Sequence, residues 1–252
     1  MSDMFSLEGK RALVTGARTG IGQAIAVGLA EAGADVILLG HQDNMQETEQ
    51  MIESLGKSYK SVIVDLGNVA ELSTKCEELI LQVGHVDILV NNAGIIRREA
   101  AIDHSLENWQ AVIDTNLNSV FIICQKFAKS MIEKGAGKII NIASLLSFQG
   151  GITVPGYAAS KHGVTGLTKA LANEWAGKGI QINAIAPGYI ETNNTEALRN
   201  NEERNKSILG RIPAEKWGTP TDLVGAAVFL ASPASNYVNG HVLAVDGGWM
   251  AR

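Results

Sequence analysis

The segment Thr15-Gly16-Ala17-Arg18-Thr19-Gly20-Ile21-Gly22 decides the fold of this chain. An apolar run over residues 11–14 leads into it, and a helical pattern of small and apolar residues follows from Gln23. A strand, a glycine-rich turn and a helix in this order are typical of dinucleotide-binding α/β units, which hold phosphates at the helix amino terminus. Gly16 permits the tight turn, and Gly20 and Gly22 let a pyrophosphate and the next strand approach the backbone. The segment therefore predicts a dinucleotide site, although three residues rather than one separate its first two glycines.

Short apolar runs alternate with helical patterns along the whole chain. Strands alternating with helices indicate a parallel sheet with helices on both faces and right-handed crossovers. Since no linker, repeat or low-complexity tract is found, we predict one domain over 1–252, a Rossmann-type doubly wound α/β fold of about seven strands. The expected strands are 11–15, 35–39, 61–65, 88–91, 138–142, 181–185 and 242–245, and helices are expected over 20–32, 70–83 and 157–176.

A polar, charged and weakly periodic stretch covers about 192–217, after the sixth expected strand. A doubly wound sheet opens its ligand crevice at this edge. We interpret the stretch as a substrate lid, with a plain surface insertion as the alternative.

Composition excludes several classes of protein. The formal net charge of -5 argues against non-specific nucleic-acid binding. Cys76 and Cys124 have no Cys-x-x-Cys spacing, so free thiols are expected, and the five histidines form no metal-ligand pattern. No signal peptide and no membrane-length apolar stretch is recognised, so a cytoplasmic protein without metal, membrane or nucleic-acid partners is predicted.

Ser144, Tyr157 and Lys161 form the candidate catalytic group. Tyr157 and Lys161 are four residues apart and share one face of a helix. An ammonium beside a phenol favours the phenolate, so a tyrosine with an ordinary pKa of about 10 could exchange protons near neutrality. Ser144 follows the apolar run 138–143, where a hydroxyl at a strand end can hold a reacting oxygen. The Tyr-x-x-x-Lys spacing alone is weak evidence and becomes specific only beside the glycine-rich turn.

Together with Asn91-Asn92-Ala93-Gly94 and Pro187-Gly188, these motifs resemble those of the short-chain dehydrogenase/reductase family over essentially the whole chain. The resemblance implies an oxidoreductase that transfers a hydride between a nicotinamide cofactor and an alcohol or ketone. It also implies catalytic roles for four residues, namely Asn116, Ser144, Tyr157 and Lys161.

In that family pattern Tyr157 exchanges the proton, while Lys161 lowers the pKa of Tyr157 and holds the nicotinamide ribose. Ser144 hydrogen-bonds the substrate oxygen as charge develops on it. Asn116 anchors a water; taken without the family, an asparagine in this helical pattern would be a kink or cap residue.

Cofactor contacts are implied along the expected strand ends. The residues are Gly16, Arg18, Thr19, Gly20, Ile21, His41, Asp65, Leu66, Asn92, Ala93, Gly94, Tyr157, Lys161, Pro187, Gly188, Ile190 and Thr192. Gly40 occupies the family's usual acidic position at the ribose, and Arg18 could pair with a 2′-phosphate. A neutral His41 is a poor phosphate partner, so we predict NAD rather than NADP. Asp65 is expected to bind the adenine amine, with a helix N-cap as the alternative.

Segments 91–99, 144–151, 186–195 and 245–252 resemble a bacterial subfamily acting on 2-deoxy-D-gluconate or 2-dehydro-3-deoxy-D-gluconate. Neutral hydrogen-bonding side chains suit sugar hydroxyls, and a sugar-acid carboxylate needs a cation. The candidate substrate residues are Ser144, Gln149, Asn193, Asn194, Arg98 and Arg211, where each arginine could instead be a solvated or interface residue. A 3-oxoacyl-[acyl-carrier-protein] reductase, a gluconate 5-dehydrogenase and a non-catalytic cofactor sensor stay as alternatives.

The family resemblance also implies a homotetramer. The helix expected over 157–176 carries Val164, Leu167 and Leu171 beside small residues, which suggests more apolar surface than one sheet contact needs. Trp249 lies near the end of the chain, where little sequence is left to cover it. We therefore expect a neighbouring subunit to bury both features.

Overall fold

A seven-stranded parallel sheet forms the centre of the computed structural model, which describes residues 3–251. The strand order is β3-β2-β1-β4-β5-β6-β7, and every neighbouring pair is parallel. The order reverses between β1 and β4, so the ligand crevice of this fold lies at their carboxyl ends. The strands are β1 (Arg11–Thr15), β2 (Asp35–Gly40), β3 (Tyr59–Ile63), β4 (Ile88–Asn91), β5 (Gly137–Ile142), β6 (Ile180–Pro187) and β7 (Val242–Val245).

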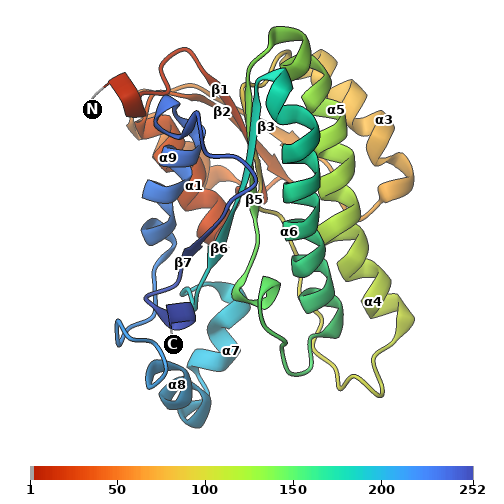
Figure 1. Ribbon diagram of the computed structural model, residues 1–252, viewed down its shortest axis with the longest axis vertical. Helices are drawn as coiled ribbons and strands as arrows, with labels where there is room; N and C mark the ends of the chain where they lie inside the picture. The colour runs from red at the N-terminus through yellow and green to blue at the C-terminus, as the bar shows by residue number, and fades with distance from the viewer. Residues whose placement is uncertain (1–2, 252) are drawn as a thin grey trace.

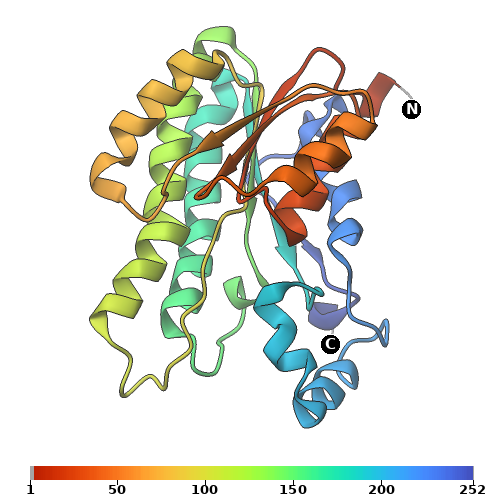
Figure 2. The ribbon, with the colours of Figure 1, turned by 180° about the vertical axis from the view of Figure 1, so that it is seen from behind.

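Helices cover both faces of the sheet (Figures 1 and 2). One face carries α1 (Gly20–Glu31), α2 (Gln46–Ser54) and α9 (Val224–Ala231), and the other carries α3 (Val69–Val83), α4 (Leu106–Ile113), α5 (Ser119–Lys134) and α6 (Pro155–Trp175). Each face buries its own apolar cluster. In β1, Ala12 and Val14 belong to one cluster and Leu13 to the other, as expected for a strand with a period of two that is buried on both sides.

The segment after β6 leaves the sheet beyond Ile190 and returns beside that residue at Gly218. It contains α7 (Glu196–Arg199) and α8 (Glu202–Leu209), which lie together at one end of the molecule near the C-terminus (Figure 1). Ile190 and Gly218 form an isolated parallel bridge, and the amide of Glu191 donates to the carbonyl of Gly218 at 2.8 Å. The segment predicted as a lid is therefore a helical excursion whose two ends are hydrogen-bonded to each other.

The predicted doubly wound sheet is confirmed, with one shifted element. The third strand was expected over 61–65 but spans Tyr59–Ile63, because its pairing with β2 begins at Tyr59 opposite Val36. Asp65 consequently lies two residues beyond the strand. The other expected strand and helix ends agree with the structure within two residues. Among residues 3–251, no helix is both long enough and apolar enough to cross a bilayer.

Candidate active site

The glycine-rich turn is locked against the end of β4. Asn92 donates from Nδ2 to the carbonyls of Thr15 at 3.0 Å and Gly16 at 3.2 Å. The Thr15 hydroxyl accepts from the amides of Asn92 and Ala93, each at 3.0 Å. A Cβ on Gly22 would lie 2.2 Å from the Gly16 oxygen, so only glycine permits this approach. The observed role of Asn92 is therefore to shape the predicted cofactor turn.

The start of α1 fits a dinucleotide pyrophosphate. Its N-cap, Thr19, makes no side-chain capping hydrogen bond, which leaves the first amides of α1 available to an anion. Gly20 has a φ of +60°, and Thr192 Cγ2 lies 3.4 Å from where a Cβ of Gly20 would stand. Thr192, the first residue of the predicted lid, therefore packs against the turn at Gly20.

The remaining predicted contacts of the nicotinamide half lie at the carboxyl ends of the central strands. Gly188 donates its amide to Val245, and a Cβ on Gly188 would lie 2.6 Å from the Cα of Asp246. Ile190 is buried with 4% of its surface exposed. The residues that the sheet brings to this edge are Gly16, Asn92, Ala93, Gly94, Pro187 and Gly188.

The adenosine half is more open. His41 and Asp65 are exposed, whereas Leu66 is buried. Asp65 accepts from the amide of Gly67 at 2.9 Å, and Asn68 rather than Asp65 is the N-cap of α3. The alternative role of Asp65 as an N-cap is thus wrong, and its carboxylate borders the expected adenine position.

No acidic side chain stands at the end of β2. A Cβ on Gly40 would lie 2.9 Å from the sulfur of the buried Met45. The side chain of Arg18 is half-buried, and no ion pair among residues 3–251 includes it. Gly40 therefore leaves little room for an acidic side chain at its own position, and Arg18 supplies a half-buried cation in the glycine-rich turn.

Ser144, Tyr157 and Lys161 come together as predicted. Ser144 follows the end of β5, and Tyr157 and Lys161 lie one turn apart in the first half of α6. The Ser144 side chain lies close enough to Tyr157 to lower the pKa of its phenol. The Lys161 Nζ lies 5.6 Å from the centre of the Tyr157 ring and donates to the Ile142 carbonyl at 2.6 Å.

Lys161 is not among the groups that shift the pKa of Tyr157 in this structure. Burial raises the pKa of Tyr157 above its ordinary value, and the Ser144 side chain and the Arg98 charge only partly oppose the rise. Lys161 is itself 5% exposed, and burial lowers its pKa to about 8. Its ammonium donates to a backbone carbonyl rather than to the phenol oxygen. Burial therefore sets the direction in which the pKa of each of the two groups shifts.

Asn116 connects the loop after β4 to α6. It lies in a π-helical turn (Asp114–Asn118) between α4 and α5 and is 1% exposed. Its Oδ1 accepts from the amide of Ile95 at 2.8 Å, and its Nδ2 donates to the Ile95 carbonyl at 2.9 Å and to Ser160 Oγ at 3.3 Å. The wider turn presents this side chain inward, beside the residue that precedes Lys161.

A buried polar chain that the sequence did not reveal fixes α6 on the sheet. Asn91 Nδ2 donates to Asn141 Oδ1 at 2.8 Å, and Asn141 Nδ2 donates to Thr168 Oγ1 at 2.9 Å. All three residues are less than 5% exposed. This chain runs from β4 through β5 to α6, and it holds the helix that carries Tyr157.

Two predicted substrate segments meet at the mouth of the crevice. Arg98, in the loop after β4, donates from Nη2 to the Asn194 carbonyl at 3.5 Å. The charge of Arg98 also lowers the pKa of Tyr157, which places this cation within electrostatic reach of the catalytic phenol. Asn193 and Asn194 are exposed at the start of the predicted lid.

Gln149 and Arg211 meet on the C-terminal Trp249. Gln149 accepts from the indole Nε1 at 3.0 Å, and the Arg211 guanidinium lies 4.1 Å from the centre of the indole ring. Trp249 is only 5% exposed within its own chain, so the expectation that a neighbouring subunit must cover it is wrong. Its cover consists of Leu145, Ile208, Ile212 and Trp217 with Tyr189 beside them.

Sequence reasoning also missed three residues that hold the segment predicted as a lid: Tyr189, Arg199 and Trp217. Tyr189 packs edge-on to Trp217, with ring centres 5.4 Å apart, and Arg199 donates to the Thr192 carbonyl at 3.3 Å. These partners are distant in sequence or carry no local signal.

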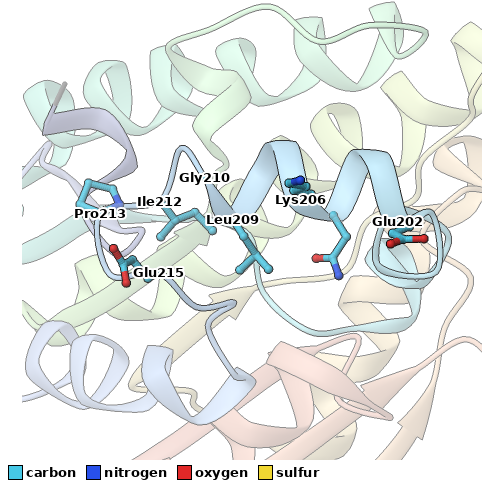
Figure 3. A pocket seen from close by; sticks show the side chains of 8 residues that line it. Glu202, Lys206, Leu209, Gly210, Ile212, Pro213 and Glu215 are labelled. Atoms are coloured by element: carbon cyan, nitrogen blue, oxygen red, sulfur yellow. The ribbon is translucent and has the colours of Figure 1, made fainter.

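One side of α8 borders a hollow of about 700 Å³ (Figure 3). Its lining contains none of the predicted catalytic or cofactor residues: Glu202, Asn205, Lys206, Leu209, Gly210, Ile212, Pro213 and Glu215.

A parallel doubly wound sheet with a glycine turn, and with a serine, a tyrosine and a lysine gathered at its carboxyl edge, defines a class of nicotinamide-dependent oxidoreductases. The chain belongs to the short-chain dehydrogenase/reductase family, and a model of that family described as "Enoyl-(Acyl carrier protein) reductase" matches residues 16–250.

Within the family the chain is similar to sugar-acid dehydrogenases. It is 58% identical to the 2-dehydro-3-deoxy-D-gluconate 5-dehydrogenase of Bacillus subtilis (strain 168), over 100% of this chain and 99% of the relative. A protein of Agrobacterium tumefaciens assigned as a 2-deoxy-D-gluconate 3-dehydrogenase and solved with bound NADP has a TM-score of 0.94, 56% identity and 100% coverage of both chains. A gluconate 5-dehydrogenase from Burkholderia cenocepacia J2315, in complex with NADP and tartrate, has a TM-score of 0.93 and 40% identity, covering 99% of this chain and 98% of that chain.

Proposed function

We propose that this enzyme oxidises a secondary hydroxyl of a sugar acid, 2-dehydro-3-deoxy-D-gluconate or 2-deoxy-D-gluconate, and reduces the corresponding ketone in the reverse direction. The observation that carries the proposal is the gathering of Ser144, Tyr157 and Lys161 at the carboxyl edge of the sheet, with the Lys161 Nζ 5.6 Å from the centre of the Tyr157 ring. The names of the relatives support the substrate class.

The chemistry requires one hydride and one proton to leave the CH–OH group. When bound, the nicotinamide accepts the hydride. Tyr157 takes the hydroxyl proton on its phenolic oxygen, and Ser144 donates a hydrogen bond to the substrate oxygen. Because burial raises the pKa of Tyr157, the phenol carries its proton at neutral pH and is prepared to protonate a ketone. Oxidation uses the phenolate and should therefore become faster as the pH rises.

Lys161 and Asn116 support this proton exchange. Lys161 would hold the nicotinamide ribose, and its buried Nζ keeps a positive charge on the same side of α6 as Tyr157. Asn116, bonded to Ser160 and Ile95, would anchor the water through which the proton leaves.

Arg98 is the cation that we assign to the sugar-acid carboxylate. It contacts the first turn of the lid and acts electrostatically on Tyr157. Asn193 and Asn194 then supply hydrogen bonds to hydroxyls. The segment 192–217 acts as a substrate lid, because Thr192 packs against the cofactor turn while Arg98 ties the following residues to the opposite loop.

NAD is the proposed preferred cofactor, and NADP is proposed as a weaker alternative. The exposed His41 is the only candidate cation at the end of β2, and when neutral it offers little to a 2′-phosphate. Arg18 supports the weaker use of NADP, since the structural relatives carry that cofactor and no described carboxylate pairs with this guanidinium.

We also propose a homotetramer in the cytoplasm. Val164 and Leu171 fill the core of their own subunit, but Gly166 and Ala170 of α6 and Phe121 of α5 are exposed. Small residues beside an exposed aromatic ring suit the close approach of a second helix pair across a two-fold axis.

A substrate panel tests the proposal. Sugar acids and acyl thioesters are supplied with NAD or NADP, and the change in absorbance of the reduced cofactor is followed. The highest kcat/KM is expected for one of the two deoxy sugar acids. Preference for an acyl thioester would identify a 3-oxoacyl reductase, preference for gluconate a gluconate 5-dehydrogenase, and normal NADH binding without any turnover a cofactor sensor.

A further inference from the structure

Several contacts hold the side chain of Trp249 in one orientation. Its indole lies between Tyr189, with ring centres 4.7 Å apart, and the Arg211 guanidinium, 4.1 Å from the ring centre. The aromatic contact and the cation each stabilise one orientation of the ring. The carboxylate of Asp246, three residues before Trp249, accepts hydrogen bonds from the backbone amides of Gly248 and Met250, both at 2.9 Å, so the backbone is also held.

This fixed ring determines the orientation of the Gln149 side-chain amide. The indole Nε1–H can only donate, so the oxygen of the Gln149 amide must be the atom that faces it at 3.0 Å. The NH₂ group therefore points away from the indole. No described residue accepts a hydrogen bond from this NH₂ group. The backbone of Gln149 is nevertheless anchored, because its N–H donates to the carbonyl of Leu145, the residue that follows Ser144.

We infer that Trp249 is a positioning residue, which holds the amide of Gln149 so that its NH₂ group donates to an oxygen of the sugar acid. The inference rests on the proposed function, and it deepens that function by assigning the polarity of one substrate contact. The oxygen is an acceptor, either a carboxylate oxygen or a hydroxyl lone pair. Without the indole, the amide is free to rotate and to present its oxygen instead.

The central test is a double-mutant cycle between Gln149→Ala and Trp249→Phe. Phenylalanine keeps an aromatic ring for Tyr189 and Arg211 but removes the N–H donor. Each single variant should raise the KM for the preferred sugar acid about 2- to 10-fold, as the loss of one hydrogen bond predicts, with kcat and the NADH dissociation constant little changed. In the Q149A background, W249F should have no further effect on KM, because it acts only through Gln149.

Trp175→Phe is the matched control. Trp175 is 7% exposed and belongs to the apolar cluster on one face of the sheet, which contains neither Trp249 nor Gln149. Its replacement removes an indole N–H from a buried tryptophan without touching Gln149, so W175F should leave the KM for the sugar acid unchanged. Equal KM effects of W175F and W249F, or additive effects of W249F and Q149A, would overturn the inference, as would an unchanged KM in Q149A.

Gln149→Glu separates the two possible acceptors. The indole can still donate to the new carboxylate, but the NH₂ group is replaced by a negative charge. A rise in KM far above that of Q149A identifies a substrate carboxylate, and an equal rise identifies a hydroxyl. If the wild type oxidises no sugar acid, the proposed function fails; if it does so and W249F behaves as W175F does, only the positioning role fails.

Discussion

Replacing Lys161 with methionine should change the free energy of unfolding in a pH-dependent way. The value for K161M, taken relative to the wild type, should be more favourable at neutral pH than at high pH. Lys161 is 5% exposed, and burial lowers its pKa from 10.5 to about 8. That difference corresponds to about 3 kcal/mol of unfavourable free energy when the side chain is charged. The cost is present in full below about pH 8, falls between about pH 8 and 10.5 where only the unfolded chain keeps the proton, and is absent above that range.

The assay is urea unfolding of the wild type and K161M at several pH values and one protein concentration. The free energy of unfolding of K161M minus that of the wild type should decrease by about 3 kcal/mol as the pH rises from about 7 to 10.5. Loss of the hydrogen bond to Ile142 shifts the whole curve by a constant amount and leaves this slope unchanged. Lys169, exposed on the same helix, supplies the control K169M. A difference that is independent of pH would refute the argument that burial controls Lys161.

Four other outcomes are expected. Tyr157→Phe should lower turnover at least ~10²-fold with NADH binding retained, measured by steady-state kinetics and fluorescence titration. NAD should give a higher kcat/KM than NADP, and Arg18→Gln should lower the value for NADP alone; a wild-type preference for NADP contradicts the assignment. Gly22→Ala should abolish cofactor binding by calorimetry, because its Cβ would lie 2.2 Å from the Gly16 oxygen. Light scattering should report about four times 26.7 kDa, and a fully active monomer would refute the tetramer.

The fold was predictable because its signals are local. Apolar runs of strand length, a glycine turn and helical periodicity each arise within a few neighbouring residues, and they located all seven strands. Only the third strand was displaced, since its register is set by pairing with β2 rather than by its own sequence. Local motifs likewise identified Ser144, Tyr157 and Lys161 as a group.

Effects that depend on distant segments were not predictable. The pKa of Tyr157 follows burial by the folded chain, whereas the sequence shows only the neighbouring lysine. Trp249 was expected to be exposed because little chain follows it, yet its cover comes from residues between 145 and 217. The polar chain from Asn91 to Thr168 joins three elements that no local pattern connects.

The bridge between Ile190 and Gly218 joins the two ends of the segment that follows β6. This segment is therefore suited to exchange between related proteins. Because its ends are already joined, a segment of different length can be inserted there at little entropic cost and without altering the register of β6. The packing of Ile208, Ile212 and Trp217 on Trp249 adds a condition. A chimaera that receives a foreign segment between Ile190 and Gly218 must also receive matching residues around Trp249, so two separate stretches of the gene have to change together.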